Sequence, residues 1–166
     1  MAYNRFVNQK QLVENAWSTV ETELTRRHDL IPNLVETVKG YAAHEQQTLE
    51  AVVEARTRAS KSHGTMAGQA ADENDLINAT RSLLALSEAY PDLKADRSFL
   101  KLQDELVGTE NRIQAGRRFY NNNVRDLNRR VQSIPSNVVA RLAGIRVEEY
   151  YQIDEAVSRL PPGTTI

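Results

Sequence analysis

The stretch DRSFLKLQDELVGTENRIQAGRRFYNNNVRDLNRRVQSI (residues 96–134) decides the fold, because it holds the longest regular pattern in the chain. Positions three and four residues apart recur along it for about five heptads. Most of them are apolar, and they are Phe99, Leu102, Leu106, Thr109, Ile113, Gly116, Tyr120, Asn123, Leu127, Arg130 and Ile134. This spacing predicts a helix over 96–133 whose seam packs against other helices. Asp96 can cap its start, and Pro135 ends it.

The rest of the chain carries the same spacing in shorter stretches. We predict further helices, with approximate bounds, at 3–28, 31–61, 74–89 and 135–143. Gly144 can close the last of these, and residues 62–73 gather glycine and small side chains as a flexible loop. The predicted fold class is all-α, an up-and-down four-helix bundle with long helices over residues 1–151. Residues 152–166 lack a firm period, so we expect an irregular tail along the surface.

Pro32 marks the predicted corner between the first two helices. Its ring disfavours the helical region for the residue before it, and its nitrogen has no hydrogen to donate. Proline is nevertheless common in a first helical turn, where Asp29 can cap and Asn33 can bond the backbone. We therefore predict a structural corner at Asp29, Pro32 and Asn33. The alternative is a single kinked helix of about 60 residues, a rod of roughly 90 Å with too little domain to pack against.

The composition limits the classes of function. The chain has 166 residues, a net charge of −1 and no cysteine. One domain of this length can bury a core, and its nearly balanced charge gives no overall attraction to nucleic acid or membranes. No apolar run approaches the ~18 residues that cross a bilayer, and the first residues lack the apolar segment of a signal peptide. Without cysteine, disulfides and thiolate chemistry are excluded.

The histidines do not have the spacing of a metal site. His44-Glu45 begins like the zinc motif H-E-x-x-H, but the second histidine is missing. A di-iron bundle needs glutamate three residues before histidine, and no histidine here has one. We therefore predict no catalytic residue, no metal and no cofactor, and we place His28 and His44 at helix ends or on the surface.

One surface feature stands out. Between Arg112 and Arg130 the chain has six arginines and a single acid, Asp126. Heptad positions put four residues of this stretch on the side of the helix away from the core, and we call them the arginine face: Arg118, Asn122, Arg125 and Arg129.

Arginine presents five donors and suits phosphates and carboxylates. The arginine face is therefore a candidate contact for anionic lipid headgroups or for an acidic protein partner. The plainer interpretation is a solvated face paired with acids of neighbouring helices, such as Glu36, Glu50 and Glu54. We expect no nucleic acid, because the face lacks interleaved aromatic side chains.

Two further groups of residues carry expectations. Polar residues at or beside the seam are expected to be partly buried, with the arginines bonded to acids of the first two helices: Thr109, Arg117, Asn123 and Arg130. Apolar residues with no clear core position would bind a partner if they formed one patch: Val7, Leu12, Leu30 and Tyr151.

Several segments resemble the LemA family of bacterial proteins, which also has magnetosome-associated members. They lie in order between Tyr3 and about Tyr151, and they are RRHDLIPNLVETVKGYAAHE (26–45), AYPDLKADRSFLKLQDEL (89–106), TENRIQAGRRFYN (109–121) and IPSNVVARLAG (134–144). The resemblance implies an up-and-down four-helix bundle and no established reaction, cofactor or active site. It also implies a transmembrane helix directly before Tyr3. Only Met1 and Ala2 precede that residue, and we expect that this helix has been removed.

From the residues and the resemblance together we expect a non-catalytic, membrane-associated scaffold or assembly factor. Its place would be the bacterial inner membrane or a magnetosome-type membrane. Its partner would be a membrane protein or a membrane surface, with self-association possible and no small-molecule substrate. The alternative function is peripheral binding of anionic lipid or phosphate through the arginine face.

Overall fold

The computed structural model describes residues 2–61, 63–153 and 160. Over these residues the chain is helical without strands, so the predicted all-α class is confirmed. The long helices are α1 (Ala2–Lys39), α2 (Gln46–Ala59), α3 (Met66–Ala85) and α5 (Arg97–Gln132). Three short helical segments complete the order, namely the 3-10 turn η1 (Leu86–Glu88), α4 (Pro91–Lys94) and α6 (Ser136–Leu142).

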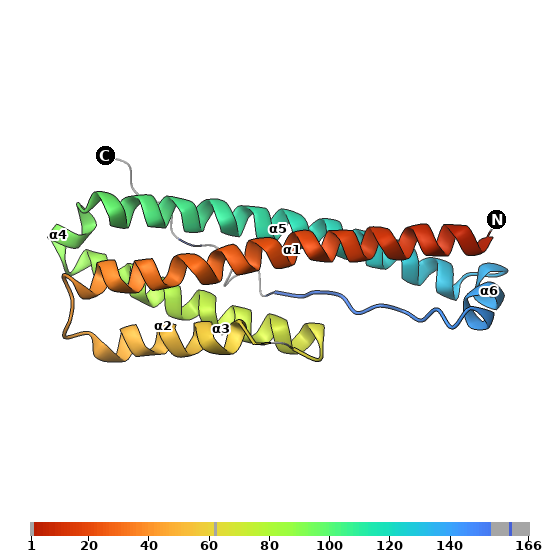
Figure 1. Ribbon diagram of the computed structural model, residues 1–166, viewed down its shortest axis with the longest axis horizontal. Coiled ribbons are helices and arrows are strands. Elements are labelled where there is room, and N and C mark those ends of the chain that lie inside the picture. Colours follow the sequence, from red (N-terminus) through yellow and green to blue (C-terminus); the bar gives the residue numbers. More distant parts are fainter. Residues whose placement is uncertain (1, 62, 154–159, 161–166) are drawn as a thin grey trace.

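Helices α1 and α5 lie side by side and give the molecule its rod shape (Figure 1). With 38 and 36 residues, they extend roughly 57 and 54 Å. The seam between them buries the apolar positions of both helices, among them Phe6, Val20, Phe99 and Ile113. A Cβ atom at Gly116 would lie 3.1 Å from Val20 Cγ2, so glycine permits the close approach of the two helices there.

Helices α2 and α3 form a second pair beside the half of the rod that ends at α4 (Figure 1). Both are shorter than α1 and α5, so they cover only part of the long pair. At the other end, α6 packs against α5 and the beginning of α1. It is closed by Gly144, whose φ of +67° is the left-handed conformation that glycine adopts most readily.

The predicted corner at Asp29, Pro32 and Asn33 is wrong, because α1 continues through all three to Lys39. Pro32 cannot donate to the carbonyl oxygen of His28, four residues earlier. Arg56 Nε of α2 donates to that oxygen instead, at 2.7 Å. The apolar stripe also continues beyond the proline, so burial keeps the segment helical. The chain turns later, at 40–45, before α2 begins at Gln46.

The other helix bounds also differ from the predicted ones. Helix α2 occupies only part of 31–61, because α1 takes the first part of that range. Helix α3 begins at Met66, inside the range predicted as a loop, because the Thr65 side chain accepts a hydrogen bond from Gly68 N at 3.0 Å. Helix α5 begins one residue after Asp96, whose side chain accepts from Phe99 N at 2.8 Å.

The segment after α6 does not follow the expectation of a surface tail. Residues 145–153 run back along the long helix pair toward its middle (Figure 1). Tyr151, Ile153 and Leu160 are buried in the core. This burial follows from helix length, because α2 and α3 leave the other half of the α1–α5 pair uncovered. The remaining tail residues, 154–159 and 161–166, lie outside the described residues.

Candidate functional site

Four ionisable side chains meet inside the molecule, and we call them the ionic cluster: Arg27 and His28 of α1, Glu73 of α3, and Glu110 of α5. Arg27 is only 2% exposed and binds both carboxylates. Its Nη1 lies 2.6 Å from Glu110 Oε2, and its Nη2 forms a short contact with Glu73 Oε2. His28 Nε2 lies 2.8 Å from the other oxygen of Glu73. The cluster therefore joins three helices at one point.

Two glutamines complete the hydrogen bonding of these carboxylates. Gln69 donates to Glu73 Oε1 at 2.9 Å, and Gln114 donates to Glu110 Oε1 at 3.0 Å. Buried ions are expensive unless their remaining lone pairs are bonded, and here both acids have several donors. The charged groups of the cluster are therefore paired with one another inside the molecule.

The electrostatics of the cluster keep Glu73 and Arg27 charged. Burial raises the pKa of Glu73, but the hydrogen bond from His28 and the charge of Arg27 outweigh burial, so its pKa is lowered. Burial lowers the pKa of Arg27, but the two carboxylates outweigh burial, so its pKa is raised. Glu73 and Arg27 are thus both held in their charged forms near neutral pH.

Reasoning from the sequence missed the ionic cluster and misplaced His28, which is buried and not at a helix end. A signal was present in the spacing. Arg27 is three residues after Leu24 and four before Ile31, on the apolar stripe of α1. Glu73 is four residues before Ile77, on the apolar stripe of α3. Opposite charges on the core stripes of different helices indicate a buried ion pair.

Two asparagines of α5 bind the extended segment to the helix. Asn128 Nδ2 donates to the Glu148 oxygen at 2.9 Å, and its Oδ1 accepts from Glu148 N at 2.8 Å. Asn121 makes the same pair of bonds with Tyr151, both at 2.9 Å. The two asparagines are seven residues apart, hence two turns on one side of the helix. Each asparagine side chain thus bonds both the backbone N–H and the backbone oxygen of one residue in the extended segment.

An aromatic group lies between this segment and the ionic cluster. The ring of Trp17 in α1 is 5.3 Å from the ring of Tyr120 and 5.1 Å from that of Tyr151. The Tyr120 hydroxyl donates to the Glu149 oxygen at 2.9 Å. Burial, with the nearby carboxylates of Glu148 and Glu149, raises the pKa of Tyr120 to about 12. These rings fasten the returning chain to the middle of the rod.

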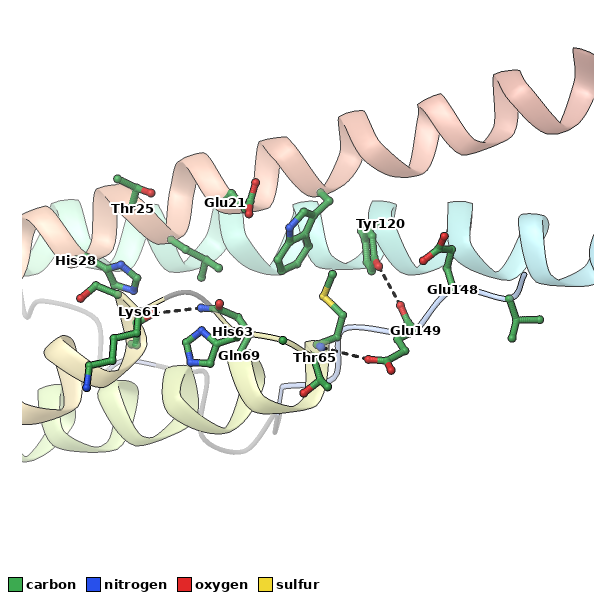
Figure 2. Close-up of a pocket in the computed structure, with 17 residues that line it drawn as sticks. Glu21, Thr25, His28, Lys61, His63, Thr65, Gln69, Tyr120, Glu148 and Glu149 are labelled. Carbon is green, nitrogen blue, oxygen red and sulfur yellow. Dashed lines mark hydrogen bonds between the residues drawn. The ribbon is translucent and has the colours of Figure 1, made fainter. Parts of the chain in front are cut away.

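A cavity of about 790 Å³ opens beside the aromatic group. Figure 2 shows its lining from α1, from the chain between α2 and α3, and from residues around Glu149. Its two imidazoles already have carboxylate partners, since His63 Nε2 lies 2.7 Å from Asp72 Oδ2 and His28 is bound to Glu73. In the described part of the chain, no three histidine, aspartate or glutamate side chains are grouped as metal binding would require.

The arginine face lies where the heptad spacing puts it. Arg118, Asn122, Arg125 and Arg129 are all exposed on α5. Arg125 Nη2 donates to Asn122 Oδ1 at 3.2 Å. Among the described residues none of the three arginines pairs with a carboxylate, so the expected pairing with Glu36, Glu50 and Glu54 is not found. The face presents guanidinium groups to solvent.

The expectations for the polar seam residues hold only in part. Thr109, Arg117 and Asn123 are buried, but Arg130 is exposed. Arg117 Nε donates to Gln114 Oε1 of the same helix at 3.1 Å, and the backbone oxygen of Asn123 accepts a hydrogen bond from Gln9 at 3.1 Å. The expected pairing put the arginine on α5 and the acid on the first or second helix. In the ionic cluster, α1 supplies the arginine, Arg27, and α5 supplies the acid, Glu110.

The four apolar residues that would bind a partner if they formed one patch, Val7, Leu12, Leu30 and Tyr151, do not form an exposed patch. Tyr151 has no exposed surface, and Val7 and Leu30 are partly buried, with only Leu12 clearly exposed. The extended segment carries Tyr151 inward, which no periodicity indicated.

Comparison with known proteins assigns this architecture to a family. The model of the LemA family matches residues 16–164, which is most of the chain. The chain belongs to the LemA family. The match spans α1 from its middle, the ionic cluster, the arginine face and the extended segment. The ionic cluster and the two asparagines therefore lie within the residues that match the family.

The relatives found are distant in sequence. Protein LemA of Metamycoplasma hominis is 23% identical over 152 residues, covering 92% of this chain and 69% of that protein. Magnetosome proteins MamQ 2 and MamQ 1 of Paramagnetospirillum magneticum are each 25% identical over 177 residues, covering 92% of this chain and 65% of each of them. The chain thus spans about two thirds of the length of these relatives. None of the helices in its described part combines the length and the apolar content needed to cross a membrane.

Proposed function

We propose that this LemA-family chain is a non-catalytic scaffold or assembly factor that works at a membrane. The four long helices would act together as one up-and-down four-helix bundle that holds a binding surface rigid. Two relatives are magnetosome proteins by name. That name supports a place at a bacterial inner membrane or a magnetosome-type membrane.

The state of the buried charges supports a structural role over an enzymatic one. A catalytic acid or base needs an atom that can reach the substrate and a pKa suited to proton transfer. Arg27 and Glu73 are instead held ionised by each other inside the bundle. His63, which lines the cavity of Figure 2, has its Nε2 2.7 Å from Asp72 Oδ2, and its Nδ1 is buried without a hydrogen-bond partner among the described residues. The ion pairs of Arg27 and Glu73 stabilise the bundle, and this supports a structural role for the buried charges.

The observation that carries the proposal is the arginine face. Three guanidinium groups on one side of α5 are exposed and have no carboxylate partner within the described residues. Each cation near an anionic membrane surface contributes about 1 kcal/mol. The second candidate function, peripheral binding of anionic lipid or phosphate through Arg118, Arg125 and Arg129, rests on the same observation.

Vesicle sedimentation tests the membrane contact. The chain is mixed with phosphatidylcholine vesicles, with and without phosphatidylserine, at low and high salt. We expect binding that depends on phosphatidylserine, weakens with salt and falls at least tenfold in R118E/R125E/R129E. Binding that neither salt nor these substitutions changes would contradict a role for the arginine face.

A second experiment separates a scaffold from a lipid binder. The chain is immobilised and exposed to detergent-solubilised bacterial membranes, and a retained membrane protein is then purified and tested for direct binding. A scaffold retains a partner that binds the purified bundle when no lipid is present. If lipid binding is intact but no direct partner is found, the peripheral lipid binder is the better description.

A further inference from the structure

One end of the rod is far more basic than the rest of the molecule. It consists of residues 2–10 of α1 and residues 125–146, which include the end of α5 and α6 (Figure 1), and we call it the α6 end. It holds one acid, Asp126, and seven basic residues, namely Arg5, Lys10, Arg125, Arg129, Arg130, Arg141 and Arg146. The whole chain has a net charge of −1, so the rod is strongly polarised along its length.

The same end carries exposed aliphatic side chains. Ile134 is 86% exposed, Val138 is 58% exposed and Leu142 is 84% exposed. They are spaced four residues apart, and Val138 and Leu142 share one face of α6. The helix turns Ala140 inward, where it is buried. Helix α6 thus leaves the face with Val138 and Leu142 exposed, while its inward side packs on α1 and α5.

A small hollow lies at the same end of the rod. It has a volume of about 330 Å³ and is lined by Arg5, Phe6, Arg130, Pro135, Ser136 and Val139. The two arginines are 125 positions apart in the sequence and line the same space. Within the described residues neither of them forms an ion pair. Paired guanidinium groups with free donors are suited to a phosphate group.

We propose that the α6 end is a docking site for an anionic phospholipid bilayer. A headgroup phosphate binds in the hollow between Arg5 and Arg130, while Ile134, Val138 and Leu142 enter the boundary between headgroups and acyl chains. Basic residues together with exposed aliphatic residues at one end of a protein are the composition of surfaces that lie in a membrane interface. A soluble acidic protein would satisfy the arginines but would not account for the exposed aliphatic residues at the same end.

The site determines how the rod meets the membrane. The hollow is at an end, so the rod meets the bilayer with its α6 end and points its α4 end away. This inference rests on the proposed membrane association. The α6 end shares Arg125 and Arg129 with the arginine face, but the hollow and the exposed aliphatic residues lie outside that face. The two sets of residues can therefore be tested separately.

The test uses vesicle sedimentation with paired variants of the full chain. We expect R5E/R130E to lower the affinity for phosphatidylserine vesicles at least tenfold. The triple change I134S/V138S/L142S should lower it about as much and should leave the remaining binding more sensitive to salt. The matched control is R97E/K101E, which makes the same charge change at exposed residues of the opposite end of α5 and should bind like the wild type. Circular dichroism is used to check that each variant is folded.

Insertion can be observed directly because the chain has no cysteine. A polarity-sensitive fluorophore attached at L142C should shift to the blue on vesicle binding. The same fluorophore at K101C should not shift. A shift at both positions, or at neither while the protein sediments with vesicles, would overturn end-on docking.

The outcomes separate this inference from the proposed function. If R118E/R125E/R129E abolishes binding and R5E/R130E does not, the arginine face acts alone and the α6 site is wrong. If the wild type binds no vesicle, the membrane association and the α6 site both fail. If inorganic phosphate competes fully for the hollow and the serine variant binds vesicles normally, the site is a phosphate site and not a lipid-docking site.

Discussion

Replacement of Arg27 by methionine tests the ionic cluster most directly. Arg27 is 2% exposed, and the two carboxylates that it binds have almost no exposed surface. In R27M, Glu73 keeps His28 and Gln69, but the arginine charge that balances both acids is gone. Removal of one partner from a buried ionic group costs about 3–5 kcal/mol. For a domain of this size, that corresponds to a decrease in Tm of roughly 6–20 °C.

The assay is thermal and urea unfolding followed by circular dichroism. The control is R26M, which changes the neighbouring exposed arginine of the same helix and should shift the free energy of unfolding by less than about 0.5 kcal/mol. The triple variant R27M/E73L/E110L replaces the charges with apolar side chains. It should recover more than half of the lost stability, because no unpaired buried charge remains.

Two results would refute this reasoning. A loss below about 1 kcal/mol in R27M would place Arg27 in the range of exposed ion pairs, contrary to its burial. A triple variant no more stable than R27M would mean that the loss came from packing and not from unpaired carboxylates.

Three further predictions concern the bundle. R56M should lower the free energy of unfolding by about 1–3 kcal/mol, because it leaves the His28 oxygen without a donor. In a P32A background the same change should cost much less, because the introduced alanine supplies the missing N–H. Additive effects of the two substitutions would contradict this. The folded pKa of Glu73 lies below its ordinary value of 4.5, so its stabilisation is complete above that value and is lost as the pH falls through the folded pKa. E73Q should therefore show a smaller decrease in Tm than the wild type on acidification below about pH 4.5. Asn123→Leu should raise the free energy of unfolding by about 1 kcal/mol, since Gln9 keeps its backbone acceptor, and a lower Tm would count against it.

The sequence determined the helical class and the main seam of the fold. The three-and-four spacing from Phe99 to Leu127 buries apolar surface on one side of a helix whatever its neighbours are. The caps at Asp96 and Gly144 are local, because each depends on a few consecutive residues. The exposed arginine face follows from the same spacing. These features need no knowledge of how distant segments meet.

Only the tertiary structure decided the features that join distant segments. Pro32 reads as a corner because its local cost is evident, whereas the compensating donor, Arg56, lies 24 residues further along the chain. The ionic cluster forms only because charged residues of α1, α3 and α5 lie at the same level of the bundle. The hollow between Arg5 and Arg130 exists only because α6 returns to the beginning of α1. Periodicity reports which side of each helix is buried, but the identity of the group facing a buried charge depends on packing between helices, and that information is not local.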